Sequence, residues 1–214
     1  MNRRSHTSTA CVAVVLVCVA LSVPANAQPA SPPLSILDVP FISQSEALCG
    51  GAAAAMVLRY WGARGLDAES FASLVDRGAG GIRTNRLMED LRRRGWNAVE
   101  VEGREDLVEA ELGRGRPVLA LIEDRPGTFH YIVIVAATPH AIVLHDPART
   151  PFRVMEREQF ARRWSRADRW MAVVTPIESS RSSEPPAPVA AIEGSSCADL
   201  IASGVQRAQA VAQI

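Results

Sequence analysis

Cys49 stands where a predicted helix begins, and this position can give a thiol nucleophilic chemistry. Unpaired N–H groups and the helix dipole at an N-terminus favour an anion, so a thiol there ionises below its free pKa of about 8.5. The resulting thiolate can attack a carbonyl carbon. Taken alone, Cys49 also fits a small buried hydrophobic residue, which is the usual role of a free cysteine. A catalytic role therefore requires partner residues.

Residues on both sides of Cys49 suit acyl chemistry. The side-chain amide of Gln44 and the backbone N–H of Cys49 can together form an oxyanion hole. Gly50 and Gly51 weaken the first helical turn, and their missing side chains let a substrate backbone come close. We therefore predict an oxyanion-hole role for Gln44 and substrate binding at Gly50 and Gly51.

A base for the thiol has few candidates, because the sequence contains four histidines. His6 falls in the predicted signal peptide, and His140 falls in a Thr-Pro-His-Ala turn where we expect it to be solvated. His130 opens an apolar run at the entrance of a predicted strand, where its side chain can face a cleft. His130 is therefore the predicted base, although a structural histidine at a strand end is the alternative.

Asp146 is the predicted partner of His130. It follows His145 at the end of the apolar run 141–144. If that run returns as a hairpin beside the strand that begins at His130, the two side chains meet. A carboxylate on one imidazole nitrogen would fix the tautomer and leave the other nitrogen for the thiol. Formation of an Asp-Pro turn is the alternative role for Asp146.

The elements that must position these residues divide the chain in two. Apolar periodicity predicts helices in the first part of the chain. Gly62 and Gly95 follow two of these helical patterns and mark where the helices end. Short β-branched runs separated by Gly, Pro and Asp then predict an antiparallel sheet interrupted by one helix. A helical lobe followed by a sheet lobe is an α+β fold. The predicted helices are 49–61, 67–75, 84–94, 106–112 and 156–164, and the predicted extended runs are 34–39, 117–122, 129–136, 141–144, 152–155 and 170–175.

The domain organisation follows from changes in composition. Arg3 and Arg4 precede an apolar run, 10–23, and a small-x-small triplet ending at Ala27, which indicates a cleaved secretory signal and an exported, periplasmic or secreted protein. The run is shorter than the roughly 20 residues of a spanning helix, so an uncleaved anchor is the less favoured alternative. The predicted segments are a signal peptide (1–27), a leader (28–33), a catalytic domain (34–177), a flexible linker (178–195) and a C-terminal helix (196–214) that could dock a partner.

Composition excludes several classes of protein. The 23 basic and 23 acidic residues balance, so no global field favours nucleic acid. No Cys/His pair has the spacing of zinc ligands, and we predict no metal or cofactor.

Signal removal leaves Cys49 and Cys197 in a compartment that permits disulfides. A bridge between them would favour a binding module over an enzyme, but the linker between them makes close Cα approach unexpected.

Three ordered motifs resemble the bacteriocin-processing, double-glycine leader peptidases. They are the nucleophile region (Val39–Gln44, Cys49–Ala53 and Met56–Gly62), the histidine motif (His130–Ile134) and the aspartate motif (Asp146–Ala148), within 34–176. The resemblance implies a papain-like fold with Cys49 as nucleophile, His130 as base, Asp146 as the orienting residue and Gln44 in the oxyanion hole. A peptide or protein substrate is expected.

The best-known members of that family are cytosolic domains of transporters with an ATPase. This sequence instead carries an export signal and no Gly-x-x-x-x-Gly-Lys-Ser/Thr phosphate loop, so ATP use is not implied. The sequence more closely resembles stand-alone exported relatives, and this resemblance does not specify a substrate. The hypotheses are therefore a cysteine peptidase, a peptide-binding module that does not cleave, and an acyl transferase on the same acyl-enzyme.

Overall fold

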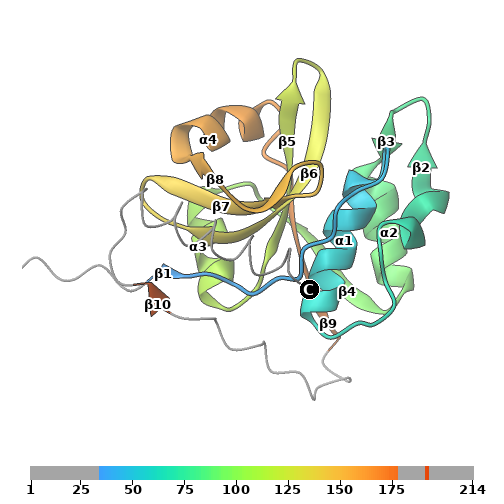
Figure 1. Ribbon diagram of the computed structural model, residues 1–214, viewed down its shortest axis with the longest axis horizontal. Coiled ribbons are helices and arrows are strands. Elements are labelled where there is room, and N and C mark those ends of the chain that lie inside the picture. Colours follow the sequence, from blue (N-terminus) through green and yellow to red (C-terminus); the bar gives the residue numbers. More distant parts are fainter. Residues whose placement is uncertain (1–33, 178–190, 193–214) are drawn as a thin grey trace, which may run out of the picture. The chain divides into compact units, whose positions relative to one another are not determined.

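The computed structural model describes residues 34–177 and 191–192 (Figure 1). The predicted signal peptide, the leader, most of the linker, Cys197 and the C-terminal helix lie outside the described residues. Among the described residues, no helix has the length and apolar character needed to cross a membrane. Helices come first and an antiparallel sheet follows, which confirms the predicted α+β class.

Helix α1 (Cys49–Tyr60) begins at the residue predicted, and it is buried on almost every side. Every position from Gly50 to Leu58 is buried, and Arg59 alone in this helix is exposed. A run of four alanines (52–55) gives the surrounding elements a narrow surface to pack against. Gly62 ends the helix with φ +91°, a left-handed conformation that glycine adopts without a Cβ clash. The nucleophile candidate therefore sits on a rigid, buried scaffold.

The next predicted helix, 67–75, is wrong in type and length. The structure has a 3₁₀ helix, η1 (Glu69–Leu74), followed by a short hairpin of β2 (Val75–Asp76) and β3 (Gly81–Ile82). Val75 pairs with Ile82, so this β-branched residue leaves the helix to join a strand. The hairpin lies beside the N-terminus of α1, where it borders the candidate site.

Helix α2 (Thr84–Arg93) matches its prediction, and Leu87, Met88 and Leu91 are fully buried. Gly95 follows it with φ +85°. The strand after it, β4 (Trp96–Val101), was not predicted. It lies at the edge of the sheet and buries only Ala98 completely, so its sequence carries a weak strand signal.

Six strands form one antiparallel sheet in the order β4-β9-β5-β6-β7-β8. The five strands predicted from the sequence are confirmed; four are longer than their apolar runs, and β9 has the predicted length but begins one residue later. They are β5 (Val118–Arg125), β6 (Thr128–Ala137), β7 (Ala141–Asp146), β8 (Thr150–Glu156) and β9 (Met171–Pro176).

The sheet separates two hydrophobic cores. Figure 1 shows α1 and α2 on one side of it and α4 (Arg157–Ser165) on the other; α3 (Glu105–Gly113), the weak helix of the sequence, shares the second core. From Tyr131 to Val135, adjacent residues of β6 belong to different cores, since strand side chains alternate between faces. Polar side chains can therefore be placed where β6 and β7 end, at the edge of the two hydrophobic cores.

The segment before α1 follows the sheet. Leu37 N–H donates to the Val135 carbonyl at 3.0 Å, and Ile36, Leu37 and Val39 are buried. Of the predicted extended run 34–39, β1 covers Leu34–Ser35, which pairs with β10 (Ala191–Ile192). These two residues are the described part of the predicted linker, and they form a strand.

Gly50 and Gly51 make room for protein atoms. A Cβ on Gly51 would lie 2.6 Å from the Ala68 carbonyl oxygen and 2.9 Å from the Phe71 Cβ. A Cβ on Gly50 would lie 3.1 Å from the Tyr131 ring. These glycines therefore allow α1 to pack closely, and their predicted contact with substrate stays a prediction.

We expect Gly51→Ala to destabilise the protein. Overpacking against backbone costs about 1–3 kcal/mol, which exceeds the helix-propensity gain of alanine. Gly113→Ala in α3 is the matched control, because a Cβ there meets no heavy atom within 4 Å. It should raise the free energy of unfolding by roughly 0.5–1 kcal/mol. Urea unfolding measures both, and equal effects of the two substitutions would contradict the packing account.

Candidate active site

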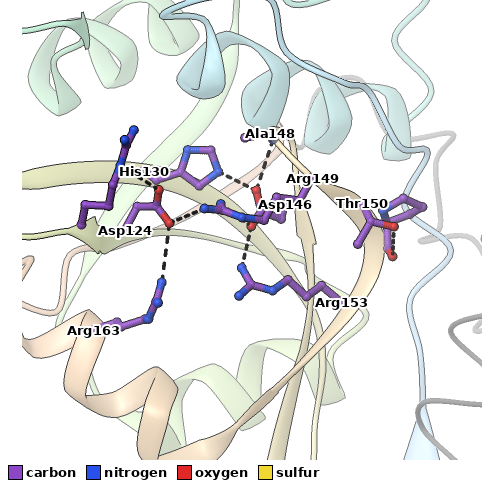
Figure 2. Close-up of polar contacts among 10 residues, drawn as sticks. Asp124, His130, Asp146, Ala148, Arg149, Thr150, Arg153 and Arg163 are labelled. Carbon is purple, nitrogen blue, oxygen red and sulfur yellow. Dashed lines mark hydrogen bonds and ion pairs between the residues drawn. The ribbon is translucent and has the colours of Figure 1, made fainter.

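Three predicted residues meet where α1 approaches the ends of β6 and β7. Cys49 opens α1, His130 lies near the start of β6, and Asp146 ends β7. Antiparallel pairing of β6 and β7 brings the last two residues together, with His130 Nε2 and Asp146 Oδ1 2.8 Å apart (Figure 2). The predicted hairpin and the predicted proximity of His130 to Asp146 are thereby confirmed.

The Cys49 thiol is free and partly exposed. Burial raises its pKa, but hydrogen bonds from the His130 side chain and the Tyr131 N–H oppose this, as does the Gly50 N–H, and the pKa ends below its ordinary value. Two of these donors are backbone groups fixed by α1 and β6. The thiol therefore ionises readily where a ligand can reach it.

His130 is held as a cation. Burial lowers its pKa, whereas the hydrogen bonds to Asp146 and to Cys49 raise it, with a net rise from 6.5 to about 9. Because Asp146 takes Nε2, the other ring nitrogen, Nδ1, is left for Cys49. Near neutral pH the geometry thus favours a thiolate beside an imidazolium.

Asp146 remains ionised in spite of being fully buried. Burial raises its pKa, but the hydrogen bond and charge of His130 and the nearby Arg149 lower it to about 2. A carboxylate in this state keeps accepting from His130 over the whole neutral and mildly acidic range.

Gln44 lies in the loop before α1 and is tied to the aspartate end of β7. Its backbone N–H donates to the carbonyl of Pro147, the residue after Asp146, at 3.0 Å. Its side-chain oxygen Oε1 is buried and has no hydrogen-bond partner among the described residues. Between Gln44 and Cys49, the chain makes a turn with Leu48 N–H donating to Ser45 and with Ala47 at φ +62°. The position suits the predicted oxyanion hole, and the role itself stays a prediction.

His145, which precedes Asp146, faces the opposite side of the sheet. Its Nε2 lies 2.8 Å from the Val39 carbonyl oxygen, and its Nδ1 accepts the Phe152 N–H at 3.0 Å. Both bonds require the neutral ring with its proton on Nε2. Burial lowers the pKa of His145 to about 4 against the weaker opposing effect of the Val39 hydrogen bond. His145 therefore anchors the segment that leads to Gln44.

The state of His145 predicts an acid-sensitive stability. Its pKa is about 4 in the folded chain against 6.5 in the unfolded one, so stability is complete above pH 6.5 and falls as the pH drops toward 4. The loss amounts to about 3 kcal/mol. We expect His145→Gln to be less stable at pH 7 but to lose about 3 kcal/mol less than the wild type between pH 7 and pH 4. The free energy of unfolding of both proteins would be measured with denaturant at each pH. An equal loss of this free energy in the two proteins between pH 7 and pH 4 would refute the assignment.

Sequence reasoning missed several contacts of the site. Arg149 and Arg153 both bind the Asp146 carboxylate, and the Tyr131 N–H supports the thiol. Arg149 had a local signal, since it lies three residues after Asp146 in a turn. Arg153 had none, because its approach depends on how β8 pairs with β7. His140 is exposed, as predicted.

No group of three or more His, Cys, Asp or Glu residues within the described part of the chain could hold a metal ion. The chemistry that this geometry can perform is nucleophilic attack by a thiolate with acid–base help from an imidazole.

The family model for the Peptidase C39-like family matches residues 36–170. This chain belongs to that family. The match begins before Gln44 and ends after Asp146, so the C39-like region contains all of the predicted site residues. No curated protein matches the chain.

Solved structures show that this C39-like chain has the papain-like fold of C39 peptidases. A putative C39-like peptidase from Bacillus anthracis is 17% identical, covering 67% of this chain and 98% of its own, with a TM-score of 0.57. The peptidase domain of Streptococcus ComA is 15% identical, covering 69% of this chain and 100% of its own, with a TM-score of 0.55. A double-glycine motif protease from an AMS/PCAT transporter, in complex with the leader peptide, is 21% identical. It covers 69% of this chain and 99% of its own, with a TM-score of 0.52.

Proposed function

We propose that this C39-like protein is an exported cysteine peptidase whose nucleophile is Cys49. The observation that carries the proposal is the arrangement at the start of α1, where Cys49 contacts His130 and His130 contacts Asp146. A thiol, an imidazole and a carboxylate in this order form the minimal apparatus of a thiol hydrolase. Membership of a peptidase family supports the same reaction class.

The reaction begins with attack of the Cys49 thiolate on a peptide carbonyl carbon. The carbonyl oxygen becomes an oxyanion, which accepts hydrogen bonds from the Cys49 N–H and from the Gln44 side-chain amide. His130 then gives its proton to the leaving amine as the C–N bond breaks, leaving a thioester on Cys49. Neutral His130 next removes a proton from water, the hydroxide attacks the thioester, and the acid product leaves with the thiolate restored.

The proposed substrate is a peptide or a protein segment. One structurally similar protease was crystallised with a leader peptide, which supports a peptide ligand for this fold. Export, inferred from residues 1–27, would place the enzyme in the periplasm or the medium, so its substrates would be peptides met outside the cytoplasm. The reaction needs no ATP and no metal ion.

A mixture of peptides that includes Gly-Gly sequences tests the proposal. Purified protein and its Cys49→Ala variant would be incubated with the mixture, and products identified by mass spectrometry. We expect cleavage by the wild type alone. Identical product patterns for the two proteins would refute peptidase activity at Cys49.

The same assay separates the alternatives. Water labelled with ¹⁸O marks the new carboxylate if the enzyme hydrolyses, whereas an added amine captures the acyl group if the enzyme is a transferase. Saturable peptide binding without any Cys49-dependent product would indicate a binding module.

A further inference from the structure

The carboxylate of Asp146 is surrounded by more donors than an orienting residue requires. Oδ1 faces His130 Nε2 at 2.8 Å and accepts the Ala148 N–H at 3.2 Å. Oδ2 accepts from Arg149 Nη1 at 2.9 Å and from Arg153 Nη1 at 2.7 Å (Figure 2). The two oxygens therefore have different partners, imidazole on one and two guanidinium groups on the other.

These two arginines reach Asp146 from different elements. Arg149 comes from the turn after β7, three residues beyond Asp146, and Arg153 comes from β8. Both guanidinium groups are partly exposed, whereas Asp146 is fully buried. A buried carboxylate is stable as an anion only if charge and hydrogen bonds replace its lost hydration. The arginines supply that replacement from the solvent side.

A second acidic residue holds one of the arginines. Arg149 Nη2 donates to Asp124 Oδ1 on β5 at 2.6 Å, and Arg163 Nη1 of α4 lies 3.6 Å from the same oxygen. Figure 2 shows Asp124 between Arg149 and Arg163. Asp124 therefore fixes the direction of Arg149. From α4 inward, positive and negative groups alternate in the order Arg163, Asp124, Arg149, Asp146 and His130. Arg125 is the other charged group at Asp124, with Nε 3.9 Å from Oδ2.

We propose that Arg149 and Arg153 are positioning residues of the active site, which hold Asp146 ionised and turned so that Oδ1 faces His130. The proposal rests on the proposed function, since it presupposes an imidazole that works on Cys49. Neither arginine contacts Cys49 in the described hydrogen bonds, so both act through Asp146.

The consequence is operation at acid pH. An arginine beside an aspartate lowers the carboxyl pKa by about 1–3 units. Without the two guanidinium groups, Asp146 takes up a proton at a higher pH. A neutral carboxyl group no longer stabilises the imidazolium, and Cys49 then loses its thiolate at a higher pH.

The test is the pH dependence of Cys49 alkylation by iodoacetamide in Arg149→Met, Arg153→Met and the double variant. We expect the acid limb of Cys49 alkylation to move upward in the double variant, by no more than the roughly 1–3 units by which an arginine lowers a carboxyl pKa, and by less in each single variant. Arg153→Lys should show little of the shift seen in Arg153→Met, because the lysine keeps a positive charge near Oδ2. Arg114→Met is the matched control, since Arg114 forms the same i,i+3 type of pair with Glu111.

Thermal unfolding of each variant shows whether it is folded, and the single variants serve if the double one is not. A folded variant whose profile coincides with that of the wild type overturns the positioning role while leaving the proposed function intact. An equal shift in Arg114→Met overturns it as well. A wild-type profile centred near the free-thiol pKa of about 8.5 would instead overturn the proposed function itself.

Discussion

Hydrolysis by the His130→Ala variant should be slower than by the wild type by a factor of about 10²–10⁴ in kcat at neutral pH. His130 supplies both the positive charge beside the Cys49 thiolate and the proton for the leaving amine. Alanine removes both, and it also leaves the buried Asp146 without its imidazole partner. The measurement is the rate of cleavage of a peptide found with the wild-type protein.

His140→Ala is the matched control for this variant. His140 is exposed in the β6–β7 turn, and its backbone groups, which stay in place, donate to Thr138 and accept from Arg157. We expect an unchanged kcat, because His140 makes no described hydrogen bond to Cys49, His130 or Asp146, and a change in stability of no more than about 0.5 kcal/mol. Comparable rate losses in the two variants would remove His130 from the mechanism.

Gln44→Ala is expected to lower kcat by about 10²–10³ with little change in KM. The lost amide donor acts on the oxyanion, a charge that exists in the transition state and is absent from the ground state. Steady-state kinetics with the same peptide gives both constants. A rise in KM with an unchanged kcat would indicate that Gln44 binds the substrate uniformly.

Ser43→Ala provides the control for the loop that carries Gln44. Ser43 is exposed and adjacent to Gln44, so its substitution tests whether any change in this loop disturbs the site. We expect unchanged kinetics. A large loss of kcat in Ser43→Ala would show that loop geometry, and not the amide of Gln44, determines the rate.

The residues of the site could be predicted because their signals are local. Cys49 precedes a long apolar helix pattern that ends at Gly62, and both ends of α1 are where the pattern places them. The strands around His130 and Asp146 are apolar runs separated by a Thr-Pro-His-Ala turn. A hairpin across that turn brings the start of the first strand and the end of the second to the same edge of the sheet, as the observed pairing of β6 and β7 does.

The contacts around the site could not be predicted, because they depend on how distant segments pair. Arg153 reaches Asp146 through the β7–β8 register, which contains an irregularity between Leu144 and Asp146. The side chains of His145 and Asp146 point to opposite faces of β7, and the sequence does not say which face meets His130. Burial and pairing decide that His145 is a structural residue.

Packing also changed the interpretation of the glycines. In the sequence, Gly50 and Gly51 suggest an open approach for substrate, because glycine is unfavourable in a helix. In the structure, the space beside Gly51 is filled by Ala68 and Phe71. That close approach comes from η1, a segment whose 3₁₀ geometry the periodic pattern did not reveal.

The pairing of Cys49 with His130 is tested most directly by the alkylation rate of Cys49 by iodoacetamide across pH, in the wild type and in His130→Ala, with Cys197 resolved by mass spectrometry. We expect the wild type to react well below the free-thiol pKa of about 8.5 and His130→Ala to react only near that value. Wild-type reactivity confined to the region of about pH 8.5 would mean that Cys49 and His130 form no thiolate–imidazolium pair, and it would contradict the proposed cysteine peptidase.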